Sequence, residues 1–342
     1  EKLMYRFLFL IAISFCITFV VIMGLFLSTG RSPFGLRFNP GPFFADHTVF
    51  GAFAAMWVPV LYLLAFRFDL KKRQKQLAQL ALLGFLVALF FSYSRGAWAS
   101  CLLGLILMGV FTLPKSYRRF LLPSTILFVV IGGYVWYMGQ GTGTAKNDAV
   151  SRKNLKDHVA SITNFRTDDS NAERINRWYC AIEMFKERPT TGFGPGTYAF
   201  LYGNYQRARY RTSVSTNRGD NGTAHNEFLL AMSETGWMGA IILLGIFIAP
   251  IVMGVRGYHR AIKKNTRLLY LAITFGLITY DIHALVNNFL DQDKIGGSYF
   301  GFMAIITALD LYVLPKERDE AARAEAKEKE LELEAAKLAE EE

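Results

Sequence analysis

The run MGAIILLGIFIAPIVMGV, residues 238–255, decides the class of this protein. It contains no charged side chain, and its length is close to the roughly 20 residues that an α-helix needs to cross a bilayer. Comparable apolar runs recur along the chain, which is 52% hydrophobic and 15% aromatic. The sequence therefore predicts an all-α, polytopic membrane protein.

Eight runs of this kind are expected to cross the membrane as helices. They lie at about residues 5–27, 48–66, 77–92, 97–113, 120–139, 238–255, 268–290 and 297–314. No small-residue cleavage site follows the first run, so we interpret it as a span and not as a signal peptide. Because the chain opens with Glu1 instead of Met, we expect that an upstream portion is missing from it.

Lysines and arginines gather in every second connection between these runs. The basic connections are 67–75, 115–119, 256–267 and 316–318. Because cytoplasmic loops are enriched in Lys and Arg, both termini are expected in the cytoplasm. The predicted parts are five N-terminal spans (1–139), a large, partly helical periplasmic loop (140–237), three C-terminal spans (238–315) and a charged cytoplasmic tail (316–342).

Charge is divided unevenly between the membrane body and the tail. The formal net charge is +10, and residues 316–342 carry 6 basic and 11 acidic side chains, which leaves +15 on the rest of the chain. Such an excess suits a membrane surface or a phosphate ligand. Nucleic acid is not indicated, because no basic stripe alternates with aromatic residues on a soluble domain. Cys16, Cys101 and Cys180 follow no disulfide or metal-binding spacing, so we expect no metal site.

The loop at 140–237 is too long for a simple connection, and loops of this length are usually functional. Residues 173–188 have helical periodicity, and Pro189 ends that pattern. The glycine run 192–196 does not indicate a nucleotide loop, because Pro195 removes a backbone donor and no strand precedes it. A short helix beginning near Ala224 is expected to carry residue 225 and to end at Gly236.

Two side chains share the predicted outer face. Arg95 opens a span, and its small neighbours leave space for a bulky ligand or a second helix, although simple snorkelling to the interface explains it equally well. A lone histidine is more often a surface or capping residue than a base. The position of His225 beside Asn226, just outside the membrane, favours a neutral imidazole that accepts a proton.

Further arginines line the loop. Arg174 and Arg177 flank the apolar stripe of the loop helix, where a solvated flank is the simplest interpretation. The functional alternative is that their guanidinium groups bind phosphate oxygens bidentately. Arg207 and Arg209 alternate along the chain, which favours adhesion to anionic headgroups. His283 belongs to a polar group late in the seventh run, which is either functional or joins helices.

In order and in membrane setting, these motifs resemble the bacterial O-antigen ligase and polymerase superfamily. The resemblance covers residues 78–290 and rests on Ser94-Arg95-Gly96-Ala97-Trp98, Arg174-x-x-Arg177-Trp178, Pro189-x-x-Gly192-x-Gly194, His225-Asn226-x-x-Leu229 and Glu234-x-Gly236. It implies a GT-C-like glycosyltransferase of the bacterial inner membrane whose active site faces the periplasm. A glycan would pass from undecaprenyl diphosphate to an acceptor hydroxyl, on a lipid A core or a growing glycan, without a metal ion or other cofactor.

The chemistry of such a transfer gives the candidate residues their roles. Arg95 and either Arg174 or Arg177 would stabilise the charge that grows on the leaving diphosphate. Neutral His225 would take the proton of the acceptor hydroxyl. The remaining residues expected to contact substrate are Arg177, Trp178, Asn226, Arg207, Arg209 and His283.

Two other classes of function remain open. A transporter or flippase of a polyprenyl-linked glycan would bind its cargo with the same arginines, although transporters tend to place ionisable groups near the bilayer midplane and to show paired halves. A scaffold protein would need an exposed apolar patch, which the aromatic residues between 193 and 205 could form. Stacking on sugars explains the same residues equally well. Ligase and polymerase are not separated, because both use the same donor and differ in acceptor.

Overall fold

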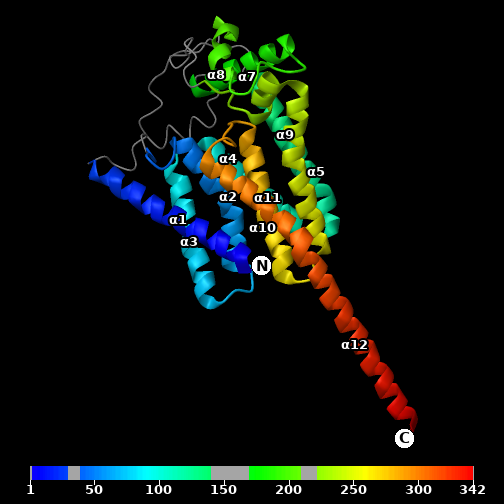
Figure 1. The fold of residues 1–342 in the computed structure, drawn as a ribbon. Coiled ribbons are helices and arrows are strands. Elements are labelled where there is room, and N and C mark those ends of the chain that lie inside the picture. The colour runs from blue at the N-terminus through cyan, green and yellow to red at the C-terminus, as the bar shows by residue number, and fades with distance from the viewer. Residues whose placement is uncertain (1, 30–38, 140–168, 209–221, 342) are drawn as a thin grey trace.

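The computed structural model describes residues 2–29, 39–139, 169–208 and 222–341. Figure 1 shows a bundle of long helices, and these described ranges contain no β-strand. The α-helices are α1 (Lys2–Ser28), α2 (His47–Phe66), α3 (Lys72–Phe91), α4 (Arg95–Thr112), α5 (Lys115–Gly139), α7 (Asp169–Glu187), α8 (Tyr198–Leu201), α9 (Glu227–Arg260), α10 (Lys264–Ala284), α11 (Asp293–Ala308) and α12 (Leu314–Glu341). A 3₁₀ turn (Tyr202–Tyr205) follows α8, and a π-helical turn (Leu309–Val313) joins α11 to α12.

A helix lies at each of the eight positions where the sequence predicts a span. Six segments are long and apolar enough to cross a membrane, namely α1, α2, α3, α4, α9 and the continuous stretch Asp293–Glu332. The polar residues Asp281 and His283 lower the mean hydropathy of α10, one of the two remaining helices. The chain is therefore a multi-pass helical membrane protein, and the count of eight spans stays a prediction.

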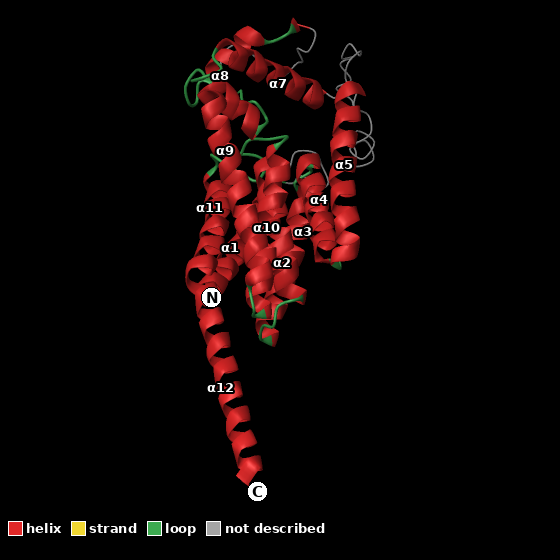
Figure 2. Cartoon of the chain, turned by 90° about the vertical axis from the view of Figure 1, so that its right-hand side faces the viewer, coloured by secondary structure: helices red, strands yellow, loops and turns green. Residues whose placement is uncertain are grey.

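The helices α2 and α10 form the centre of the bundle. Nearly every residue of α2 from Val49 to Ala65 is buried, whereas α1 presents much of its surface outward. Aromatic rings join α2 to its neighbours, as where Trp57 packs against Phe302 of α11 with 4.9 Å between ring centroids. The central position of α10 matters for the site, because its last turn reaches the end of the bundle where α7 lies (Figure 2).

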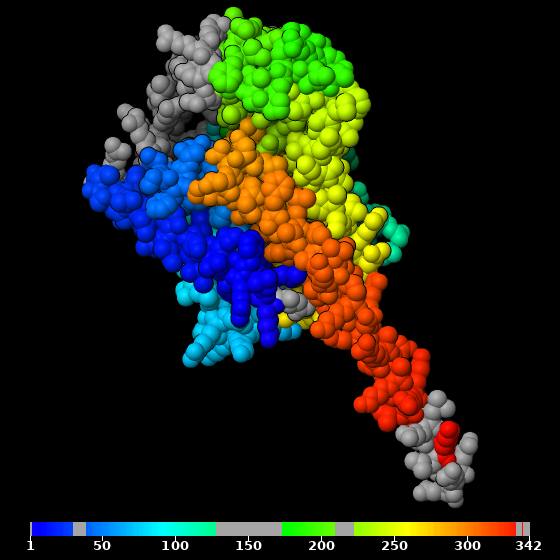
Figure 3. All heavy atoms as spheres, in the orientation of Figure 1, coloured from blue at the N-terminus to red at the C-terminus, as the bar shows by residue number. Residues whose placement is uncertain are grey.

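The two ends of the bundle differ in what they carry. The helices α7 and α8 gather at one end, here called the α7 end, where α4 and α9 also begin (Figure 1). The N-terminus and the start of α12 lie toward the opposite end, here called the tail end, from which α12 projects away from the body (Figure 3). Arg95, which opens α4, and His225, which precedes α9, therefore lie at the same end. The side of the membrane that each end faces stays a prediction.

The start of the tail helix is anchored to the start of α10. The buried carboxylate of Glu317 accepts the backbone N–H groups of Ile262 and Lys263, both at 3.2 Å, and the hydroxyl of Thr266. Lys263, at the N-cap position of α10, forms no side-chain cap of its own. A carboxylate from α12 thus supplies the negative charge that the first turn of α10 favours.

The expectation of a short helix from Ala224 to Gly236 is wrong in two respects. The helix begins at Glu227, after Asn226 as its N-cap, and His225 lies before it. It also continues past Gly236 to Arg260, with a kink where Gly236 takes φ 69° and ψ −166°. Residue spacing alone did not show that the chain resumes helical geometry directly after the glycine.

The loop that follows α7 crosses this kink and satisfies its open backbone groups. The N–H of Trp237 donates to the carbonyl of Pro189 at 2.9 Å, and the N–H of Gly194 donates to the carbonyl of Glu234 at 2.8 Å. A Cβ atom on Gly236 would lie 2.7 Å from the Pro189 carbonyl oxygen and closer still to that of Thr190. The glycines in this region therefore allow two backbones to touch, and they hold the end of α7 against α9.

Gly236→Ala should lower the free energy of unfolding by about 2 to 4 kcal/mol, because it combines a strained positive φ with a backbone overlap. The measurement is the thermal midpoint of the purified protein in detergent. Gly245→Ala, in the same helix, is the matched control, since no heavy atom lies within 4 Å of its added Cβ. Equal thermal midpoints for the two variants would contradict this account of the kink.

Candidate active site

The motif around Arg95 builds a tight turn between α3 and α4. The hydroxyl of Ser92 donates to the carbonyl of Leu89 at 2.6 Å, and the indole N–H of Trp98 donates to the same carbonyl at 2.6 Å. Ser94 caps α4 by accepting the N–H of Ala97 at 3.4 Å. The polar residues of the motif therefore satisfy backbone groups that a turn leaves open, and half-buried Arg95 becomes the first residue of α4.

The small residues beside Arg95 make room for neighbouring helices. A Cβ on Gly96 would lie 3.3 Å from the His283 ring of α10, and one on Gly51 of α2 would lie 2.7 Å from the Ser92 hydroxyl. Of the two explanations considered for this space, the structure thus shows close helix packing. His47 also contacts this turn, since its Nδ1 lies 2.7 Å from the Ser92 carbonyl oxygen. No motif in the sequence marked His47 as a candidate residue.

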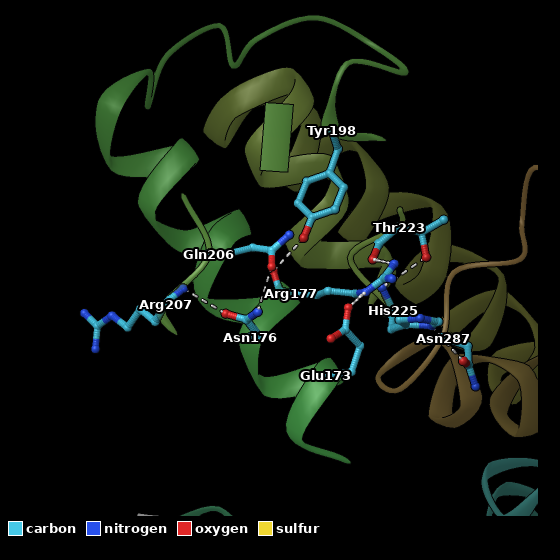
Figure 4. Close-up of polar contacts among 9 residues, drawn as sticks. All are labelled: Glu173, Asn176, Arg177, Tyr198, Gln206, Arg207, Thr223, His225 and Asn287. Carbon is cyan, nitrogen blue, oxygen red and sulfur yellow. Dashed lines mark hydrogen bonds and ion pairs between the residues drawn. The ribbon is translucent and has the colours of Figure 1, made fainter. Parts of the chain in front are cut away.

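A line of side-chain hydrogen bonds connects His225 to the interior of the bundle, and Figure 4 shows its first contact, between His225 and Asn287. The Nδ1 of His225 lies 3.3 Å from the Oδ1 of Asn287, and the Nδ2 of Asn287 lies 3.0 Å from the Nε2 of His283. The Nδ1 of His283 then lies 3.5 Å from the hydroxyl of Ser100 on α4. The line joins the loop before α9, the end of α10 and the first turns of α4.

The partners along this line determine where each proton lies. The Ser100 hydroxyl donates to the carbonyl of Ala97 at 3.1 Å, so it accepts from Nδ1–H of His283. The Nε2 of His283 then carries a lone pair and accepts from the amide N–H of Asn287. The amide oxygen of Asn287 consequently faces a protonated Nδ1 on His225, which leaves the lone pair of His225 on Nε2.

The surroundings of His225 keep its ring neutral. The pKa of His225 is lowered from 6.5 to about 3, chiefly because the ring is buried and also because Arg174 and Arg177 are positively charged, while the hydrogen bond to Asn287 opposes these effects. An imidazole with a pKa of about 3 carries no proton on its acceptor nitrogen at neutral pH. The ring is therefore in the form that can take up a proton.

The backbone at His225 is held in an unusual conformation. Its φ of 47° is in the left-handed region, which non-glycine residues seldom adopt. The indole N–H of Trp178 on α7 donates to the His225 carbonyl at 3.2 Å, and the N–H of His225 donates to the Thr223 hydroxyl at 3.4 Å. Strained residues of this kind cluster at functional sites, and here the Trp178 indole holds His225 through its backbone carbonyl.

The two arginines of α7 have different surroundings. Arg177 is buried, its Nε lies 2.8 Å from a Glu173 carboxylate oxygen, and its Nη1 donates to the Thr223 carbonyl at 3.1 Å. Its guanidinium also lies over the ring of Tyr202, 5.2 Å from the centroid. Arg174 is only half-buried, and its charge acts on both His225 and His283. Of the pair that the sequence left open, Arg174 is thus the better placed to meet an anion.

The remaining candidates lie at different distances from this centre. Asn226 caps α9 by accepting the N–H of Leu229 at 2.9 Å and donates to the Leu285 carbonyl at 2.8 Å. Arg207 places its guanidinium 3.2 Å from the centroid of the Tyr179 ring and points away from His225 (Figure 4). His283 is buried in the line described above. Arg209 lies outside the described residues, and the substrate contacts of all these residues stay predictions.

The lowered pKa of His225 makes a testable contribution to stability. Between pH 6.5, its usual pKa, and about 3, its folded pKa, the unfolded chain takes up a proton that the folded chain does not. This contribution is fully present above pH 6.5 and is lost as the pH falls toward 3. We expect acidification from pH 7 to 4 to lower the thermal midpoint of the wild-type protein more than that of His225→Gln. Parallel curves for the two proteins would refute the assignment.

The fold and this centre together define a class of protein. The chain is a helical, multi-pass membrane protein with a neutral imidazole and guanidinium groups at one end of its bundle. In comparison with protein families, residues 80–244 match the family model described as O-Antigen ligase. This match covers just under half of the chain and supports the resemblance of its motifs to the O-antigen ligase and polymerase superfamily. No curated protein matches the chain in a sequence search.

The matched region contains Arg95, Arg174 and His225 but ends before α10. Two partners in the hydrogen-bonded line, Asn287 and His283, therefore lie outside it. At the level that the family supports, the protein is a membrane enzyme of the O-antigen ligase or polymerase type, acting in polysaccharide synthesis.

Proposed function

We propose that this protein transfers a glycan from undecaprenyl diphosphate to an acceptor hydroxyl at the periplasmic face of the bacterial inner membrane. The observation that carries the proposal is the state of His225, a neutral imidazole with its lone pair on Nε2, at the end of the bundle where Arg95 and Arg174 also lie. An imidazole in this state is a general base, and arginines beside it suit an anionic donor.

The transfer is a single displacement. The acceptor oxygen attacks the anomeric carbon, while the bond from that carbon to the diphosphate oxygen breaks and its electron pair leaves with the diphosphate. The proton of the acceptor hydroxyl passes to Nε2 of His225. Attack from the face opposite the leaving group inverts the anomeric configuration. A positioned base of this kind typically contributes about 10²- to 10⁴-fold to the rate.

Arginines stabilise the leaving group in this mechanism. Negative charge on the diphosphate grows as the glycosidic bond breaks, so fixed cations favour the transition state over the ground state. Arg95, at the positive N-terminal end of α4, and Arg174 are the residues we assign to this role, while Arg177 positions the site through Glu173 and Thr223. With two guanidinium groups on the diphosphate, the proposed mechanism uses no metal ion or other cofactor.

Donor binding would also strengthen the base. The charges of Arg174 and Arg177 lower the pKa of His225, so they weaken its affinity for a proton. A diphosphate bound beside Arg174 offsets part of that positive charge and raises the proton affinity of the imidazole. The base is therefore weak in the empty enzyme and stronger when the donor is in place, which couples proton uptake to the presence of a leaving group.

The direct test supplies purified protein with an undecaprenyl-diphosphate glycan and two acceptors, a lipid A core and a second donor molecule. Whichever acceptor is extended identifies ligase or polymerase. His225→Ala should lower transfer at least about 10²-fold, because the acceptor loses its base. Lys329→Ala, on the exposed part of the tail helix α12, is the control and should retain activity. The proposal would be overturned if His225→Ala transferred the glycan at the wild-type rate. It would also be overturned if the wild-type protein moved the lipid across the membrane without cleaving the bond between the glycan and the diphosphate.

Asn287 is a positioning residue in this proposal, because its amide oxygen selects the tautomer of His225. Asn287→Leu should lower kcat about tenfold or more with little change in KM, since the acceptor for Nδ1–H is lost. Asn287→Asp keeps an acceptor oxygen and should restore most of kcat. Because the new carboxylate raises the pKa of His225, the acid limb of the pH–rate profile should move to higher pH. An unchanged profile in Asn287→Asp would contradict the assignment.

A further inference from the structure

A group of cations gathers at the tail end of the bundle, far along the helices from His225. Lys115 and Arg118 belong to the first turn of α5, and Arg267 belongs to the first turn of α10. None of the three forms an ion pair with a carboxylate in the parts of the chain that the structure describes. We call Lys115, Arg118 and Arg267 the cation cluster.

Two touching aromatic rings support the guanidinium groups of the cluster. Arg118 lies over the ring of Phe111, 5.1 Å from its centroid, and donates from Nη1 to the Phe111 carbonyl at 3.3 Å. Arg267 lies over the ring of Tyr258, 5.6 Å from its centroid, and donates from Nη2 to the Ala261 carbonyl at 3.4 Å. The two rings meet edge to face at 5.2 Å. Residues from the ends of α4 and α9 thus hold both arginines beside one another.

All three cations act on one imidazole. The ring of His259 contacts Phe111 and Tyr258, with centroids 5.9 and 5.2 Å away. The charges of Arg118, Arg267 and Lys115 all influence it, and no carboxylate is among the groups that do. The His259 ring is thus a common point for three positive charges. Their mutual repulsion is offset only by ring faces and backbone carbonyls, which are neutral groups.

Other cations in the same loop have acidic partners. Lys263 pairs with Glu320 of α12 at 2.8 Å, and Lys264 pairs with Asp69 of the α2–α3 connection at 3.0 Å. The tendency of cytoplasmic loops to be basic explains why such residues occur here. It does not explain why three cations that act on one imidazole lie together with no carboxylate among the groups that act on it.

We propose that the cation cluster binds a phosphate group. Two guanidinium forks and an ammonium group match the oxygens of a phosphate, whose charge would relieve the repulsion among them. Exposed apolar side chains accompany the cluster, since Leu113 lies two residues before Lys115 and Leu121 lies about one turn after Arg118 on α5. A phosphate that carries acyl chains would cover these side chains as well, so we assign the phosphate to an anionic phospholipid of the cytoplasmic leaflet.

The position of this site gives it a structural consequence. The cluster joins the starts of α5 and α10 to the ends of α4 and α9, and α5 lies at the edge of the bundle (Figure 2). The helices α4, α9 and α10 are the same ones whose opposite ends carry Arg95, His225 and Asn287. A bound headgroup would hold these helices together at the tail end. The inference does not depend on the proposed glycan transfer.

The test measures the thermal midpoint of the full-length protein in detergent with added phosphatidylglycerol, phosphatidylcholine or inorganic phosphate. We expect phosphatidylglycerol to raise the midpoint, phosphatidylcholine to leave it unchanged, and added salt to weaken the effect. The double variant Arg118→Gln/Arg267→Gln should bind phosphatidylglycerol at least about tenfold more weakly. Lys263→Gln/Lys264→Gln is the matched control, since it removes two paired cations from the same loop and should keep the full effect.

Each outcome bears on the proposal. If inorganic phosphate raises the thermal midpoint as much as phosphatidylglycerol does, the phosphate site is supported, and its ligand is soluble phosphate instead of a lipid headgroup. The proposal is overturned if neither probe stabilises the wild-type protein, or if both double variants respond as the wild type does. It is also overturned if both lose the response equally. If the double arginine variant does not purify in a folded state, the single variant Arg267→Gln, at an exposed residue, decides by the same criterion.

Discussion

The hydrogen bond between His225 and Asn287 is the contact on which the arrangement of the site depends. It joins the loop before α9 to the residues that follow α10, and through His283 and Ser100 it reaches α4. The Ser100 hydroxyl donates to the Ala97 carbonyl, and this direction fixes the donor and acceptor roles along the rest of the line. The orientation of the imidazole is therefore set by the packing of α4 against α10, and not by the loop alone.

A second constraint fixes the other side of His225. The loop after α7 lies across the kink in α9, where Gly192 and Gly236 let the two backbones touch. This contact ties the end of α7 to α9, while the Trp178 indole and the Arg177 guanidinium tie its middle to residues 223–225. The helix that carries Arg174 is thus held against the segment that carries His225, although these two residues lie 51 positions apart in the chain.

The sequence predicted those features that depend on local pattern. Apolar length indicated the membrane helices, Pro189 marked the end of α7, and the order of short motifs indicated the family. Patterns of this kind are read within one segment, so they could not show that Asn287 faces His225 or that Arg177 is neutralised by Glu173. They also missed the continuation of α9 beyond Gly236, because a glycine with positive φ ends many helices and only the crossing loop turns it into a kink.

Burial and nearby positive charge both lower the pKa of His225. For the proposed reaction, the arginines therefore need to lie close to the imidazole without binding it. In the proposed reaction, a histidine exposed to water would be partly protonated near neutral pH, whereas enclosure and the charge of Arg174 keep it neutral. The same enclosure strengthens the attraction between a guanidinium and a diphosphate, since the local dielectric constant is lower than that of water. A cation that bound the imidazole directly would occupy the lone pair the reaction needs. The hydrogen bond to an uncharged amide leaves that lone pair available. In the proposed mechanism, the site would thus bind an anionic donor and still present a neutral imidazole to the acceptor hydroxyl.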